Sequence, residues 1–125
     1  MKNQLLIRLL FVSFFLISMS SFAQIRQTSG KLSFLRVHDV GGKYGPANDQ
    51  IDAEVIIKFK NKPGKAFGFQ LRNDNNKVVR NGMLQILRDA FNNDYTVTID
   101  YKARKGNDVR PAAKNGVIIR VWITK

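Results

Sequence analysis

The sequence predicts a small, mainly β domain with one helix, in the order β-β-β-α-β-β. Three observations lead to this prediction. Apolar and polar side chains alternate over several short stretches, as they do in half-buried strands. One stretch carries apolar residues at helical spacing, and turn-forming residues separate the elements. Neither an open sheet nor a single helix can bury its apolar side alone, so we expect one shared core.

The first 23 residues predict a cleaved secretory signal peptide. Lys2 and Arg8 supply positive charge, residues 9–17 are almost entirely apolar, and residues 21–23 place small side chains where a signal peptidase requires them. The apolar run is shorter than the roughly 20 residues that cross a bilayer, so we expect no membrane span after cleavage. The mature chain of 125 − 23 = 102 residues is expected to be periplasmic or extracellular.

Net charge points to the kind of partner. The chain has 21 Lys and Arg against 9 Asp and Glu, and removing Lys2 and Arg8 leaves 21 − 2 = 19 against 9, a net charge of +10. Such a field attracts polyanions, acidic glycans or anionic surfaces, although solubility alone is an alternative reason for it. The chain has no cysteine, so the fold does not rely on disulfides.

The mature chain is expected to begin with a polar, flexible N-terminus over residues 24–30, followed by a single domain over residues 31–125. Residues 31–40 are predicted to form the first strand, which a glycine pair at 41–42 bends or ends. Residues 43–51 are predicted to form a loop, because Gly-Pro and Asn-Asp pairs favour turns.

A hairpin is predicted next. Residues 52–60 alternate, with four apolar side chains on one face, so Asp52 and Glu54 on the other face are expected to meet solvent. The Pro-Gly pair within residues 61–65 favours a type II turn with the glycine at positive φ. Residues 66–71 complete the hairpin with apolar side chains on one face.

The helix is predicted from apolar side chains at i, i+3, i+4, i+7 and i+8 over residues 83–91. Asn81 is its expected N-cap, and the Asn92-Asn93 pair is expected to supply the left-handed residue that ends it. The predicted stripe consists of Met83, Ile86, Leu87, Ala90 and Phe91.

Two strands follow, over residues 95–101 and 117–123, with a long basic loop between them. Both alternate, and the second is expected to place Val117, Ile119, Val121 and Ile123 on one face. Trp122 is then expected on the outer face, either in a subunit interface, as a ligand platform, or covering the end of the helix.

Five strands with one helix between the third and the fourth is the element order of the OB-fold, a small, partly open barrel. The alternative is an open antiparallel sheet with one packed helix. The export signal, the small size and the helix that leads directly into the next strand (residues 83–101) resemble the B subunits of bacterial AB5 toxins. That resemblance implies a secreted OB-fold that forms pentamers and binds host glycans.

The chain departs from those subunits in having no cysteine, because they commonly carry a disulfide. No binding residue is carried over from them, since no motif is shared. The stretch from residue 30 to residue 125 also resembles an uncharacterised family of small secreted bacterial proteins.

The residue types of common catalytic and metal sites are scarce. The mature chain has one histidine, and Ser33 and His38 have opposite parity on the first predicted strand, so they cannot form a nucleophile–base pair. One histidine without cysteine excludes the usual zinc sets, and Glu54 is the only glutamate available for paired carboxylates. We therefore expect no enzyme, no metal and no cofactor.

The candidate site lies between two loops. Ligands of OB-folds usually lie over the second and third strands, between the loop at residues 41–51 and the loop at residues 102–116. Guanidinium groups pair with carboxylates and phosphates, and tyrosine stacks on a sugar or a base. The candidate ligand-binding residues are Lys43 and Tyr44 in the first loop and Arg104, Lys105, Arg110 and Lys114, with Lys102, in the second.

These observations favour an exported, non-catalytic binding module for a glycan or other anionic ligand, which forms a homo-oligomer if the toxin resemblance holds. One alternative is an envelope assembly protein without a small ligand. Another is a nucleic-acid-binding OB module, which export and the lack of an RNA-binding aromatic motif disfavour. The long basic loop has a simpler interpretation, as a disordered solvated segment.

Overall fold

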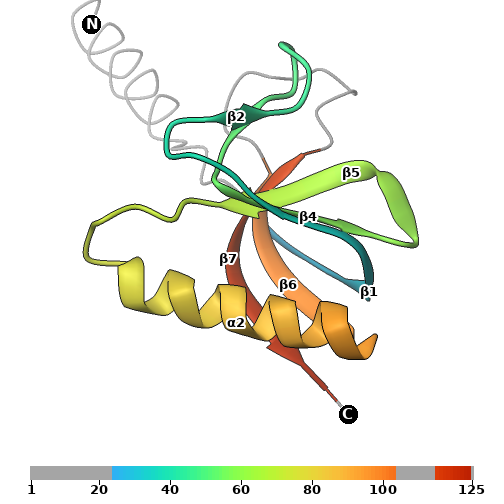
Figure 1. The fold of residues 1–125 in the computed structure, drawn as a ribbon. Coiled ribbons are helices and arrows are strands. Elements are labelled where there is room, and N and C mark those ends of the chain that lie inside the picture. Colours follow the sequence, from blue (N-terminus) through green and yellow to red (C-terminus); the bar gives the residue numbers. More distant parts are fainter. Residues whose placement is uncertain (1–23, 104–114, 125) are drawn as a thin grey trace, which may run out of the picture.

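The computed structural model describes residues 24–103 and 115–124. The predicted signal peptide and most of the long basic loop lie outside the described residues. Figure 1 shows the described elements, in which strands predominate and α2 crosses one side of the molecule. They are β1 (Ile25–Val37), β2 (Lys43–Tyr44), β3 (Ile51–Asp52), β4 (Val55–Phe59), β5 (Lys62–Phe69), α2 (Lys77–Asn93), β6 (Thr96–Ala103) and β7 (Gly116–Ile123).

The five long strands pair in a closed ring, in the order β1-β4-β5-β7-β6 and back to β1. Neighbours in the ring are antiparallel except β5 and β7, which run parallel and pair only at Phe67 with Gly116 and at Gly68 with Val117. The short strands β2 and β3 form a separate two-stranded ribbon. The prediction of a mainly β fold with one helix is confirmed.

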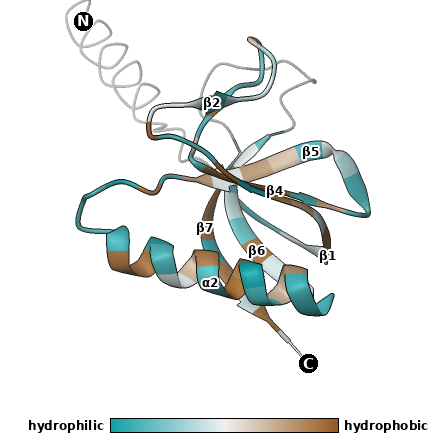
Figure 2. Ribbon diagram, in the orientation of Figure 1, coloured by the Kyte–Doolittle hydropathy of each residue, from teal (hydrophilic) through white to brown (hydrophobic). Residues whose placement is uncertain are grey.

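The core lies inside this ring of strands, under α2. Phe67 packs edge-on against Phe59 and Tyr101, with ring centroids 5.6 and 4.8 Å apart. Figure 2 shows hydrophobic and hydrophilic residues alternating along α2, as one buried stripe requires. The buried cluster consists of Leu32, Val55, Ile57, Phe59, Phe67, Phe69, Met83, Leu87, Ala90, Val97, Ile99, Tyr101 and Ile118.

The prediction of a flexible N-terminus over residues 24–30 is wrong. Residues 25–30 are the first part of β1 and pair with β6, where Ile25 lies opposite Lys102. From Leu32 onward β1 pairs with β4, and this ladder has a register shift between Leu32 and Phe34. Backbone hydrogen bonds to β6 order this polar stretch. It has too few apolar side chains for a strand to be predicted from its pattern.

The predicted type II turn is also wrong. Phe59 lies opposite Lys62, so the chain reverses at residues 60–61. Pro63 and Gly64 lie within β5, between two paired positions, and Gly64 is not among the glycines with positive φ. A bulge of this kind accepts proline, because its residues do not donate to the ladder.

The helix starts earlier and ends later than predicted. It begins at Lys77, so the expected N-cap Asn81 lies inside it, and the observed N-cap Asn76 makes no side-chain capping bond. The left-handed residue that ends it is Asp94, with φ of 54°, instead of Asn92 or Asn93. Aspartate tolerates this conformation, and here its carboxylate also binds two lysines.

The prediction of which side chains on α2 and β7 point to the core is wrong in part. Met83, Leu87 and Ala90 are buried as expected, but Phe91 is exposed. At the start of β7, Ile118 is buried and Val117 is exposed, the reverse of the prediction. A register shift beside Asp100 and Tyr101 inserts one residue, which inverts side-chain parity up to that point. Beyond it, the predicted inward residues Val121 and Ile123 pack against the core.

A second, smaller apolar cluster lies outside the ring, beneath the β2–β3 ribbon. Ile51 from the ribbon packs with Ala53, Ile56 and Ala66 from the β4 and β5 region. Phe34 and Tyr44 pack against its edge. This cluster explains why Ile56 interrupts the alternation of β4, and it holds the ribbon on the sheet.

Candidate functional site

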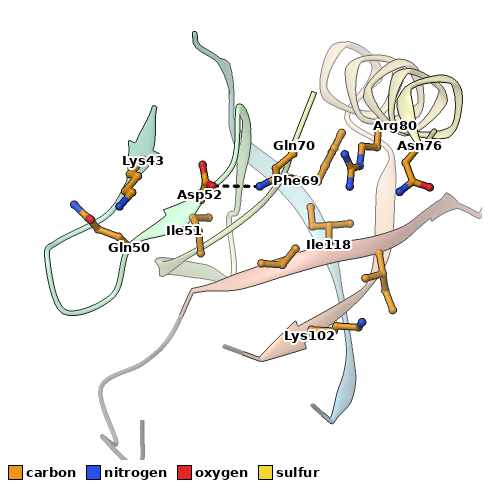
Figure 3. A pocket seen from close by; sticks show the side chains of 12 residues that line it. Lys43, Gln50, Ile51, Asp52, Phe69, Gln70, Asn76, Arg80, Lys102 and Ile118 are labelled. Atoms are coloured by element: carbon orange, nitrogen blue, oxygen red, sulfur yellow. Dashed lines mark hydrogen bonds between the residues drawn. The ribbon is translucent and has the colours of Figure 1, made fainter. Parts of the chain in front are cut away.

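A groove of about 660 Å³ opens where β5 and β7 stop pairing. Figure 3 shows it bordered by the ribbon, the end of β5, the first turns of α2 and β7. Two strands that separate after a short parallel contact leave such a space between them. The lining residues are Lys43, Gln50, Ile51, Asp52, Phe69, Gln70, Asn76, Arg80, Lys102, Val117, Ile118 and Ile119.

Three cationic side chains line this groove, each from a different element. Lys43 comes from β2, Arg80 from α2 and Lys102 from β6. Arg80 is paired with Asp74, with 2.9 Å between Nη1 and Oδ2. Lys43 and Lys102 are exposed and form no ion pair with any residue that the structure describes. Their charges are therefore available to a ligand.

The rest of the lining combines apolar and amide side chains. Ile51, Phe69 and Ile118 are buried and form the floor, together with Val117 and Ile119. The amides belong to Gln50, Gln70 and Asn76, and the Gln70 amide donates to Asp52 Oδ2 over 3.3 Å. The groove thus offers hydrogen-bond donors and acceptors beside positive charge.

Glu54, which was predicted to face solvent, is only 1% exposed. Its carboxylate accepts bonds from the backbone N–H of Gly41 (3.0 Å) and of Leu71 (2.8 Å), and from Arg72 Nε (3.2 Å) and Nη2 (3.1 Å). The alternation rule fails here because Glu54 precedes β4 and the turn after β5 folds over it. A buried carboxylate is tolerated where donors surround it.

These contacts set the protonation of Glu54. Burial alone would raise the pKa of its carboxyl, but the N–H groups of Gly41 and Leu71 and the Arg72 guanidinium together hold that pKa below its usual value. Glu54 is therefore a stable anion that joins the loop after β1 to the segment after β5.

Arg72 extends this network to the groove wall. Its Nη2 contacts Asp52 Oδ1 at 2.5 Å as well as Glu54, and both hydrogen bonds raise the pKa of the guanidinium above its usual value. Arg72 is thus neutralised by two carboxylates. Asp52, by contrast, stays 45% exposed and is held in position by Arg72 and Gln70. The wall therefore presents an oriented carboxylate.

A second buried network joins the two predicted ligand-binding loops at their bases. The backbone N–H of Asn115 lies 3.3 Å from both carboxylate oxygens of Asp49, and its side-chain amide donates to the Asp49 carbonyl at 2.7 Å. Asn115 also accepts from the Ala66 N–H at 2.8 Å. Gly45, at φ of 107°, packs so closely that a Cβ would lie 2.6 Å from the Asp49 carbonyl oxygen.

The predicted site residues separate into four groups. Lys43 lines the groove, with Lys102. Tyr44 lies on the other side of the ribbon, where its ring centroid is 6.3 Å from that of Phe34 and 5.6 Å from Lys58 Nζ. Arg104, Lys105, Arg110 and Lys114 lie outside the described residues, and Trp122 is partly buried on β7 opposite Thr98.

Sequence reasoning missed Arg80, the amides and Asp52 as groove residues. A signal for Arg80 was present: it lies three residues before Met83 and seven before Leu87, so helical spacing puts a cation on the apolar side of α2. For Asp52 the prediction of solvent exposure was correct, but nothing local indicated that Arg72 would orient it.

Other kinds of site find no support in the described part of the chain. No group of three or more His, Cys, Asp or Glu within residues 24–103 and 115–124 could hold a metal ion. In the same ranges no helix is long and apolar enough to cross a membrane. His38 turns back on its own loop, with Nε2 3.2 Å from the Gly42 carbonyl oxygen.

The chain matches no family model, no curated protein and no solved structure with which it was compared.

Proposed function

We propose that the mature chain is an exported, non-catalytic binding module that holds an anionic ligand in the groove beside the β2–β3 ribbon. The proposal includes an OB-fold-like barrel. Supporting it, the pairing order closes on itself, α2 lies between the third and fourth long strands, and the third and fifth run parallel.

The observation that carries the proposal is the convergence of three cations on one apolar floor. Lys43, Arg80 and Lys102 are distant in the sequence, and two of them have no ion-pair partner among the residues described. A recess with low-dielectric walls strengthens their attraction for an anion relative to cations scattered over the surface. The floor adds contact with the apolar part of a ligand.

The long basic loop belongs to the same proposal. Residues 104–114 connect β6, which contributes Lys102, to β7, which contributes Val117 and Ile119. By sequence this connection carries two arginines and two lysines. We propose that these side chains add to the binding of the anion.

The test is a binding titration with a panel of anions at low salt. The double substitution Lys43→Ala with Lys102→Ala should reduce the free energy of anion binding by about 0.2–1 kcal/mol per charge. The affinity for the anion is therefore expected to fall about two- to thirtyfold. The matched control is Arg26→Ala with Arg88→Ala, which removes two exposed charges outside the groove and leaves affinity within about twofold. Equal losses in the two variants would contradict a groove site.

A second candidate function is assembly in the cell envelope. It is favoured by Val78 and Val79 on the first turn of α2, which are 82% and 63% exposed. Light scattering of the mature chain tests this function, with a closed oligomer expected and Val79→Lys expected to dissociate it. A monomer at high protein concentration would exclude self-assembly.

A further inference from the structure

We infer that the ligand is an acidic oligosaccharide, one that carries carboxylates on hydroxyl-rich sugar rings, and not a phosphate polyanion. This inference rests on the proposed function of the groove and names the class of its ligand. It follows from the groups that stand beside the cations.

The first group is the Asp52 carboxylate. Its two oxygens accept one bond each from Arg72 and Gln70, which leaves acceptor capacity on an exposed side chain. Sugar hydroxyls can donate to this capacity. The ionised oxygens of a phosphate chain have no proton to donate, so the same carboxylate repels them.

The second observation is the pairing of Asp52 with Lys43. The two residues lie directly opposite each other in the ribbon, a position in which Cβ atoms are about 4.5–5.5 Å apart. A cation and a fixed acceptor are therefore neighbours on one wall. A uronic acid residue carries a carboxylate and several hydroxyls on a single ring, so one sugar can satisfy both.

The amides and the floor fit the same ligand. The side-chain amides of Gln50 and Asn76 make no hydrogen bond to another described residue, and each can donate and accept at once, as neighbouring sugar hydroxyls require. Val117 and Ile119, which are not buried, offer an apolar surface to the C–H face of a sugar ring.

The groove is less suited to nucleic acid. Single-stranded nucleic acids bind by stacking bases on exposed aromatic rings. The one aromatic side chain in the described lining, Phe69, is buried in the core and offers no such face. A nucleic acid would thus meet a carboxylate without the compensating stacking.

The experiment is calorimetry of the mature chain with tetragalacturonate, its methyl ester, tripolyphosphate and octathymidylate. We expect tetragalacturonate to bind at least tenfold more tightly than the other three. Asp52→Asn is expected to weaken tetragalacturonate about fivefold and to strengthen tripolyphosphate. Asp89→Asn removes one exposed negative charge outside the groove and is expected to change neither affinity more than twofold. Thermal unfolding of each variant confirms that it is folded.

The outcomes separate the two proposals. Binding of none of the anions overturns the proposed function itself. Binding of tripolyphosphate or octathymidylate as tightly as tetragalacturonate overturns the inference and leaves the proposed function standing. An ester that binds as well as the acid shows that charge is not recognised and refutes both. Tetragalacturonate binding that Asp52→Asn leaves unchanged removes the role given to this carboxylate and overturns the inference.

Discussion

Replacing Glu54 with glutamine tests whether this buried carboxylate holds the fold together around the groove. The substitution Glu54→Gln keeps the shape of the side chain but exchanges one acceptor oxygen for an amide donor. Oε1 accepts from Gly41 and Arg72, and Oε2 accepts from Leu71. Glutamine can accept on one side only, so at least one donor in this partly buried cluster loses its partner.

The cost can be estimated from these contacts. If the glutamine oxygen faces Gly41 and Arg72, the Leu71 N–H is left facing another donor. An unmet buried donor costs about 1–3 kcal/mol. The bonds to Arg72 also lose their ionic character, which removes about 1 kcal/mol more. The expected loss in the free energy of unfolding is about 3 kcal/mol, a large share of the usual 5–15 kcal/mol.

Urea unfolding at pH 7 measures this loss. With an m-value of about 1.5 kcal/mol/M, the midpoint of Glu54→Gln falls by about 2 M urea. Asp52→Asn is the matched control, because Asp52 binds the same Arg72 at an exposed position. Its cost is expected to stay below about 1 kcal/mol. A midpoint shift of less than about 0.5 M for Glu54→Gln would refute the estimate.

Acid provides an independent check. The pKa of Glu54 is lower in the folded chain than its ordinary value of 4.5, so the unfolded chain takes up the proton first as the pH falls. The contribution of the carboxylate is complete above pH 4.5 and is lost as the pH falls through the folded pKa. The stability gap between the wild type and Glu54→Gln should therefore narrow in acid. A gap that widens would contradict the sign of the pKa shift.

Three further predictions concern the core, the loop bases and the end of α2. Leu87→Ala empties a fully buried site and should cost about 2–5 kcal/mol in thermal unfolding, whereas a loss under about 1 kcal/mol would mean that Leu87 is not in the core. Asn115→Ala should speed hydrogen exchange of the Ala66 amide, its donor, and unchanged exchange would argue against that bond. Lys31 and Lys60 lower the pKa of Asp94 to about 2, so Lys60→Ala should raise it towards 3.8 in an NMR titration, and a pKa still near 2 would rule out that contact.

The fold was predictable from the sequence where burial follows a local period. Met83 and Leu87 lie one turn apart on α2 and are both buried, and the strand containing Val97 and Ile99 was found from its alternation. In these elements each side chain faces the core or solvent according to the chain's own geometry. Distant partners are not needed to find them.

The predictions failed where a distant segment decides the outcome. Residues 25–30 become a strand because β6, which pairs with them, follows about 70 residues later in the chain. Glu54 is buried because Gly41 and Arg72 reach it from two other segments. The parity of Ile118 is inverted by a register shift against β6. None of these partners is visible within a window of neighbouring residues.

The candidate site shows the same limit. Lys43 was predicted from its position in a loop, and it does line the groove. Tyr44, its neighbour, was assigned to the same site, but alternation along β2 sends it to the other side of the ribbon, against Phe34. For Arg80, helical spacing indicated a cation on the apolar side of α2, but nothing in the sequence indicated that it would line the same groove as Lys43.

If the groove binds an anion as proposed, its selectivity must come from its mixed charge and not from the net charge of the protein. A strongly basic chain attracts every polyanion over about 10 Å, and salt screens this attraction without regard to the ligand's structure. Asp52 opposes that general attraction at the point where Lys43 supports it, so a ligand gains from both only if it carries donors beside its anionic group. The part of the affinity that remains at physiological salt should thus depend on Asp52, while the part that salt removes should not.

A salt titration of the wild type and Asp52→Asn with tetragalacturonate separates the two contributions. Plots of the logarithm of affinity against the logarithm of salt concentration are expected to be parallel, with the plot of Asp52→Asn lower. Plots that merge at high salt would show that general charge alone attracts the ligand.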